Sequence, residues 1–240
     1  MSGAERAATT TMEFEDERRQ LAALGRRMGA DGLCVGTAGN LSVRCGEVIV
    51  ITPSGIPYEE TEPEHMCVVS VSGEVVDAPA PPSSEVPMHL AVYRATSAGA
   101  VVHTHAPFAT ALSTVVTELP AIHYVIAGLG GTVRVSPYET FGTEELAANM
   151  SAALSDRTGV ILQNHGTITY GRTLRQAYDR AVTLEWLSAT YWRAKVFGEP
   201  NILPDEEIER VRQRARTRGW QQGGAPAATP APGPPGDGQR

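Results

Sequence analysis

The sequence predicts an α/β domain, in which helices pack in layers on a sheet. Helical and strand patterns alternate along the chain. The composition, 42% hydrophobic and 20% charged, is ordinary for a globular protein. A length of 240 residues suits one large domain. We expect this domain over residues 13–220, between a flexible N-terminus (1–12) and a disordered Pro/Gly/Ala-rich tail (221–240).

The first half of the chain predicts one helix, four strands and a second helix. An apolar stripe at helical spacing indicates a helix over 13–28. Runs rich in β-branched residues, separated by turn residues, predict strands at 41–44, 48–51, 67–71 and 74–76. Ser83 or Ser84 can cap a helix over 84–95.

The second half continues the alternation of helices and short strands. The expected strands are 100–105, 134–135, 160–162 and 167–170. The expected helices are 108–114, 143–154, 174–196 and 205–216.

Charge and cysteine content exclude several classes of protein. The net charge of −7 argues against a general nucleic-acid binder, which needs a basic surface. Cys34, Cys45 and Cys67 are scattered, so neither a disulfide framework nor a thiolate metal site is expected, and a cytoplasmic location is the simpler interpretation. No secretory signal and no apolar run of membrane-spanning length is apparent.

Three histidines suggest a metal site. His103 and His105 are two residues apart, so in an extended strand both rings point to one face. His165 follows the apolar run 158–162, at the end of an expected buried strand. Three imidazoles with a fourth open or carboxylate position are typical of a catalytic divalent metal, most often Zn²⁺. Mn²⁺, Co²⁺ and Fe²⁺ remain open, as does the alternative that the histidines are only core residues.

Glu85 is the candidate carboxylate beside that metal. It falls in the first turn of the expected helix, where an acid can simply stabilise the helix dipole. Next to a metal it could be a general base or a displaceable ligand. His89, four residues later on the same helix face, is interpreted as a structural or supporting residue.

Three turns of small residues are candidates for binding an anion. They are Gly39-Asn40, Ser54-Gly55 and Ser83-Ser84. Each offers backbone N–H or hydroxyl donors, and each alone is only a turn. Together they could hold one phosphate without a Lys or Arg. Tyr124 is a candidate proton donor, although an aromatic in its apolar segment is more often a core residue.

Seven segments, in this order, resemble the class II aldolase/adducin head-domain family, and most closely its L-fuculose-1-phosphate aldolase branch. They are residues 36–42, 51–58, 82–85, 101–106, 122–124, 140–143 and 163–166. The similarity covers about residues 14–218. Each segment is weakly specific alone, whereas the ordered set is highly specific.

The resemblance implies a three-layer α/β/α domain around a mixed, largely antiparallel sheet. It also implies a homotetramer with active sites between subunits and a small phosphorylated sugar as substrate. One Zn²⁺ per subunit would be bound by His103, His105, His165 and, in the resting state, Glu85, which then acts as the base. The phosphate would be held by a set of seven residues: Thr37, Gly39, Asn40, Ser54, Gly55, Ser83 and Ser84. Tyr124, from a neighbouring subunit, would be the proton donor to the aldehyde oxygen.

The implied reaction is reversible cleavage of a ketose 1-phosphate to dihydroxyacetone phosphate and an aldehyde, L-lactaldehyde for an L-fuculose-1-phosphate-like substrate. Lys195 is the only lysine and lies late in a helix, which weakens a Schiff-base mechanism. Arg218, with Trp220 nearby, stands where that branch usually has a Tyr that positions the sugar.

Four alternatives stay open. Within the family they are a 5-deoxyribulose-1-phosphate aldolase releasing acetaldehyde, a pentulose-phosphate 4-epimerase and a methylthioribulose-1-phosphate dehydratase. Epimerases commonly carry Asp where this chain has Glu85, so Glu85 favours an aldolase. The fourth is a non-enzymatic adducin-type head domain. Those domains have lost the metal histidines, and this chain keeps all three.

Overall fold

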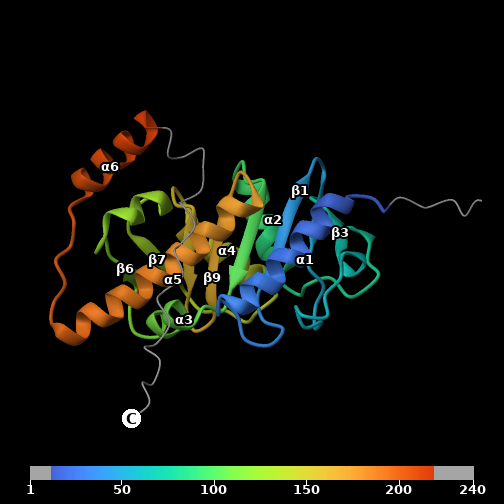
Figure 1. Cartoon of the computed structure of the whole chain (residues 1–240), viewed down its shortest axis with the longest axis horizontal. Helices are drawn as coiled ribbons and strands as arrows, with labels where there is room; N and C mark the ends of the chain where they lie inside the picture. Colours follow the sequence, from blue (N-terminus) through green and yellow to red (C-terminus); the bar gives the residue numbers. More distant parts are fainter. Residues whose placement is uncertain (1–11, 219–240) are drawn as a thin grey trace, which may run out of the picture.

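A single sheet runs through the protein in the computed structural model, which describes residues 12–218 (Figure 1). Within these residues the strand order is β4 (Val75–Asp77), β3 (Cys67–Ser70), β2 (Val48–Ile51), β1 (Asn40–Cys45), β5 (Ala100–Thr104), β9 (Gly166–Gly171), β8 (Gly159–Leu162), β7 (Val133–Ser136) and β6 (Glu118–Leu119). Only β7 and β8 pair in parallel; the other neighbours are antiparallel. The predicted mixed, largely antiparallel sheet is therefore confirmed.

Helices cover both faces of this sheet. The described helices are α1 (Glu15–Ala30), α2 (Val86–Ala95), α3 (Pro107–Ser113), α4 (Glu144–Leu154), α5 (Leu174–Phe197) and α6 (Asp205–Thr217), with short 3₁₀ helices η1 (Pro63–His65) and η2 (Tyr124–Leu129). In Figure 1, α1 and α5 cross in front of the sheet, and both contribute to one core cluster. The other face packs against α2 and α4, so the layers are α/β/α.

Alternation along β5 supplies both cores. Val102 packs in the cluster formed with α1 and α5, whereas Val101 packs in the cluster formed with α2 and α4. Successive side chains of a strand point to opposite faces. His103, two residues after Val101, therefore lies on the α2 side of the sheet, where the segment carrying Glu85 also lies.

Several element boundaries differ from the sequence predictions. The strand predicted to include His105 ends at Thr104. The helix predicted from Ser84 begins at Val86, and Glu85 occupies the N-cap position without a capping side-chain hydrogen bond. The interpretation of Ser83 or Ser84 as the N-cap is thus wrong, because the Ser83 hydroxyl instead accepts from the Glu85 backbone amide. The three-residue η1, the two-residue β6 and the 3₁₀ turns of η2 were not predicted, because they are too short or irregular for a periodicity signal.

The structure also bears on the terminal segments and the cysteines. The predicted flexible and disordered ends, together with Trp220, lie outside the described residues. All three cysteines are free thiols, as expected. None of the helices within residues 12–218 combines the length and apolar character that a membrane crossing needs.

A close backbone contact joins β9 to β5 beside the histidines. A Cβ built on Gly166 would lie 2.1 Å from the carbonyl oxygen of Thr104, and only 3.4 Å from the Cα of His105. Both obstacles are backbone atoms, so no side-chain rotation relieves them. Gly166 therefore allows the turn that carries His165 to approach the end of β5.

Gly166→Ala is expected to lower the free energy of unfolding by about 1–3 kcal/mol, because the added methyl forces two paired strands apart. Gly128→Ala is the matched control, since nothing lies within 4 Å of a Cβ at that position. The measurement is urea-induced unfolding of both variants followed by circular dichroism. Equal losses of stability in both variants would contradict the assigned contact.

Candidate metal centre and substrate cavity

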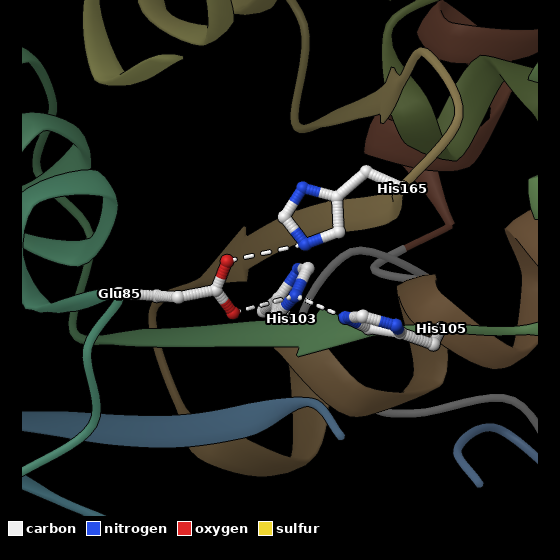
Figure 2. A group of neighbouring side chains, drawn as sticks. All are labelled: Glu85, His103, His105 and His165. Atoms are coloured by element: carbon white, nitrogen blue, oxygen red, sulfur yellow. Dashed lines mark hydrogen bonds and ion pairs between the residues drawn. The ribbon is translucent and has the colours of Figure 1, made fainter. Parts of the chain in front are cut away.

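Glu85, His103, His105 and His165 converge on one point (Figure 2). One potential ligand atom from each residue lies within 4.8 Å of the others. The three imidazole rings form a nearly equilateral arrangement, with centroids 4.8–4.9 Å apart. Glu85 closes the cluster, with Oε2 at 2.9 Å from His103 Nε2 and Oε1 at 3.1 Å from His165 Nε2.

The hydrogen bonds around His103 show that the cluster presents lone pairs. Its Nδ1 lies 2.9 Å from the carbonyl oxygen of Thr167, which can only accept, so Nδ1 carries a proton. In the neutral ring Nε2 is then an acceptor, 3.0 Å from His105 Nε2. A carbonyl that fixes the outer ring nitrogen is a common support for a metal-binding histidine.

Glu85 provides the test of fit for a cation. Its Oε1 is buried and has no hydrogen-bond partner, although His165 Nε2 lies 3.1 Å away. An orphaned carboxylate oxygen inside a protein is costly unless a charge compensates for it. Three imidazoles and one carboxylate that point their acceptors at one centre match the donor set of a catalytic divalent metal. These residues therefore fit a metal ion.

Electrostatics support the same interpretation. Burial alone raises the pKa of Glu85, but His103 and His165 outweigh it and hold that pKa well below its ordinary value. Burial lowers the pKa of His103, and the Glu85 carboxylate more than reverses this. Burial, together with His103 and His165, lowers the pKa of His105 to about 3. A cation bound among these residues would take the place of a proton on the histidines, so metal binding would weaken as the pH falls.

Two side chains that are distant in sequence, Glu185 and Ser113, accept hydrogen bonds from backbone amides close to His105 and His165. Glu185, on α5, accepts from the amides of Phe108 and Ala109 at 2.9 Å each. It therefore caps α3, which begins two residues after His105 and lacks a local side-chain cap. Ser113 accepts from the amide of Asn164, which has a positive φ of 54° in the turn before His165.

A cavity of about 340 Å³ opens beside the cluster. Glu85, His105 and His165 line it, and so do all seven residues of the predicted phosphate set: Thr37, Gly39, Asn40, Ser54, Gly55, Ser83 and Ser84. Its remaining lining residues include no Lys or Arg. The structure thus brings the predicted phosphate residues to the metal cluster, although their role in binding stays a prediction.

Asn40 has a second set of contacts that the sequence did not predict. Its side-chain Nδ2 donates to Glu85 Oε2 at 2.9 Å, and its Oδ1 lies 2.6 Å from Nε2 of His89. Both polar ends of the amide are therefore occupied inside the protein. A contact between this side chain and a phosphate would use its second N–H, because the first is donated to Glu85.

Tyr124 is not among the cavity-lining residues of this chain. It begins η2, its side chain is half exposed, and its ring stacks on His123 with centroids 4.5 Å apart. The alternative that Tyr124 is a core residue is wrong. Its predicted contribution to a neighbouring subunit's site stays a prediction.

Part of the cavity wall was not predicted from the sequence. Tyr138, Glu139, Phe141 and Asn164 also line it. The first three belong to the loop before α4, where no hydrophobic periodicity marks a function. Phe141 and Asn164 lie in segments that carry the family resemblance, but the resemblance implies no role for either.

Comparison with known proteins agrees with this geometry. The family described as Class II Aldolase and Adducin N-terminal domain matches residues 19–192. A 5-deoxy-D-ribulose 1-phosphate aldolase from Bacillus thuringiensis serovar kurstaki is 39% identical over 213 residues, covering 88% of this chain and 100% of the relative. A 5-methylthioribulose-1-phosphate/5-deoxyribulose-1-phosphate aldolase from Rhodospirillum rubrum is 42% identical over 204 residues, covering 84% and 92%.

The fold has a close match among solved structures. An L-fuculose 1-phosphate aldolase superposes with a TM-score of 0.81 at 38% sequence identity, covering 84% of this chain and 96% of that chain. The family match spans most of the chain, and these relatives are matched over nearly their whole length. The chain therefore belongs to the class II aldolase and adducin N-terminal domain family, as a member of its aldolase, or lyase, class.

Proposed function

We propose that the protein is a zinc-dependent aldolase that reversibly cleaves a ketose 1-phosphate into dihydroxyacetone phosphate and a small aldehyde. The observation that carries the proposal is the convergence of Glu85 and three histidines at a cavity lined by small hydrogen-bond donors. Mn²⁺, Co²⁺ and Fe²⁺ are alternatives for the metal, since imidazole suits all of them.

The cavity wall supports binding of a phosphate by neutral donors. Ser54, Ser83 and Ser84 offer hydroxyl groups, and Thr37 adds a fourth. Gly39 has a positive φ of 80°, and a Cβ there would lie 2.8 Å from the carbonyl oxygen of His103, so the wall can approach the cluster closely only with glycine. These groups would orient the phosphate without a cationic side chain.

Glu85 is proposed as the base for the carbon–carbon step. A divalent metal, when bound, supplies Lewis-acid polarisation of the substrate carbonyl. In the condensation direction Glu85 takes a proton from the hydroxymethyl carbon of dihydroxyacetone phosphate. The electron pair left on that carbon forms the bond to the aldehyde carbon, and the aldehyde oxygen receives a proton from Tyr124. Cleavage runs through the same proton transfers in reverse.

Two substrates fit this chemistry, and they differ in the aldehyde released. The sequence resemblance pointed first to L-fuculose 1-phosphate, which gives L-lactaldehyde. Two relatives are named for 5-deoxyribulose 1-phosphate, which gives acetaldehyde. We therefore place 5-deoxyribulose 1-phosphate first and L-fuculose 1-phosphate second.

A coupled assay for dihydroxyacetone phosphate tests the proposal. The metal-loaded protein is expected to release it from 5-deoxyribulose 1-phosphate, more slowly from L-fuculose 1-phosphate, and from neither after treatment with a chelator. L-ribulose 5-phosphate serves as the third substrate. Its conversion to an epimer, without release of dihydroxyacetone phosphate from any substrate, would contradict the aldolase and favour the epimerase.

Removal of one imidazole tests the metal assignment. His103→Ala is expected to weaken metal binding by more than about 100-fold, beyond the usual effect of losing a supporting residue. The measurement is metal content by mass spectrometry after dialysis against a competing chelator. His65→Ala removes an imidazole outside the cluster and should keep the wild-type metal content. Full metal retention in His103→Ala would overturn the ligand assignment.

We also infer a homotetramer in which Tyr124 completes the site of a neighbouring subunit. Tyr124 is half exposed and is not among the residues that line the cavity of its own chain, so its hydroxyl is free to reach a neighbouring subunit. Exposed aromatic side chains at Trp192 and Phe197, on α5, offer apolar surface for subunit contact. A cytoplasmic location, inferred from the scattered cysteines, stays a prediction.

Subunit mixing tests Glu85 and Tyr124 together. Glu85→Gln alone and Tyr124→Phe alone are each expected to lower kcat by roughly 10²–10⁴-fold, as loss of a proton-transfer group does. Co-refolded mixtures of the two variants should recover activity far above either, because some interfaces combine an intact Glu85 with an intact Tyr124. Near-wild-type kcat in either single variant, or no recovery on mixing, would exclude the shared site.

A further inference from the structure

A continuous chain of buried polar groups leads from Glu85 into the core. Beyond Asn40, described above, Nδ1 of His89 lies 2.7 Å from the Ser42 hydroxyl, which lies 2.8 Å from the hydroxyl of Tyr93. His89 and Ser42 are fully buried, and Tyr93 and Asn40 are nearly so. This series of hydrogen-bonded groups ends at Tyr93, in the apolar core cluster beneath α2, and at Glu85, in the metal cluster.

The carboxylate of Glu85 determines which group donates and which accepts in every hydrogen bond of this series. Ionised Glu85 can only accept, so Asn40 must face it with its NH₂ group. Asn40 Oδ1 then needs a donor, and the atom at 2.6 Å is His89 Nε2, which must carry its proton. His89 Nδ1 is left to accept from Ser42, whose oxygen accepts in turn from Tyr93.

The surroundings of His89 keep its ring neutral, so the same ring nitrogen remains the donor. Burial lowers the pKa of His89 to about 3, with a smaller contribution from His103. The ring is therefore neutral over the physiological range, with one donor nitrogen and one acceptor nitrogen. If His89 were replaced by an apolar residue, the buried Oδ1 of Asn40 would lose its donor, and an unsatisfied buried acceptor is costly. The amide would then lose the constraint that turns its NH₂ group towards Glu85.

We propose that His89 is a positioning residue, which acts through Asn40 to hold the Glu85 carboxylate in the orientation needed for proton transfer. This inference rests on the proposed role of Glu85 as the base. The His89 side chain is not among the residues that line the cavity or form the metal cluster, and its backbone amide donates only to the Glu85 carbonyl oxygen. The imidazole would therefore affect the reaction through the Asn40 amide.

His89→Leu and His89→Gln separate donation from packing. Leu fills similar space without a donor, whereas the Gln amide can donate to Asn40 as His89 Nε2 does. With saturating metal, His89→Leu is expected to lower kcat by roughly 10–100-fold, as loss of a supporting residue does, with little change in KM. His89→Gln should recover most of that loss. Tyr178→Phe removes a different tyrosine hydrogen bond, to Asp31 on the opposite face of the sheet, and should leave kcat unchanged.

A double-mutant cycle tests the path through Asn40. If His89 acts only through that amide, His89→Leu should cause no further loss of kcat in an Asn40→Ala background. A further loss of similar size would overturn the proposal. Equal kcat values for His89→Leu and wild type, or for His89→Gln and His89→Leu, would also overturn it.

Nitrogen-15 NMR of histidine-labelled wild-type protein gives a readout that does not depend on turnover. His89, assigned from the spectrum of His89→Gln or of Tyr93→Phe, is expected to be neutral with its proton on Nε2 from pH 8 down to pH 5. A proton on Nδ1 would reverse the chain and overturn the proposal. Failure of the base assignment is distinguishable, because Glu85→Gln would then retain turnover whatever His89 does.

Discussion

The pairing of β5 with β1 on one side and β9 on the other is the constraint on which the site depends. β5 carries His103 and ends just before His105, β1 begins with Asn40, and β9 follows the turn that contains His165. Two close backbone contacts, at Gly39 and Gly166, set the distances between these strands. The three imidazoles meet because three strand ends meet, and the rest of the cavity is added by loops around them.

Electrostatics then distinguish the two sides of the cluster. Towards the cavity, neutral hydroxyl and amide donors face space that can hold an anion. Towards α2, the same carboxylate is met by an amide that is itself held by a neutral imidazole. A charged residue in either place would shift the pKa of Glu85 and alter the affinity of the cluster for a cation. Neutral donors can hydrogen-bond to the Glu85 carboxylate without placing a further charge beside it.

Much of the fold and of the metal cluster was predictable from the sequence, because the relevant signals are local. The His103/His105 spacing follows the two-residue period of a strand, and the acidic first turn of α4 follows known capping preferences. The family resemblance then brought His165 and the small-residue turns together. The prediction that the rings of His103 and His105 point to one face required only approximate strand boundaries.

The remainder depends on tertiary contacts that leave no local pattern. The two hydrogen-bond partners of the Asn40 amide lie 45 and 49 positions away, one at the N-cap of α2 and one within it. The helix begins at Val86, after Glu85, and exact helix ends are the part of a secondary-structure prediction that a sequence pattern defines least well. Tyr138 and Glu139 reach the cavity only through the path of a loop without regular structure.

The series of hydrogen bonds between β1 and α2 can form because the spacing of polar residues along the helix nearly equals their spacing along the strand. Glu85, His89 and Tyr93 are four residues apart, a rise of about 6 Å per step along a helix. Asn40 and Ser42 are two apart, a rise of about 6.6–6.8 Å along a strand. Asn40 therefore lies between Glu85 and His89, and Ser42 lies between His89 and Tyr93. Chain length in these two short stretches is consequently fixed: inserting or deleting one residue in either would turn every polar group past it away from its partner, so this part of the protein can vary by substitution but not by length.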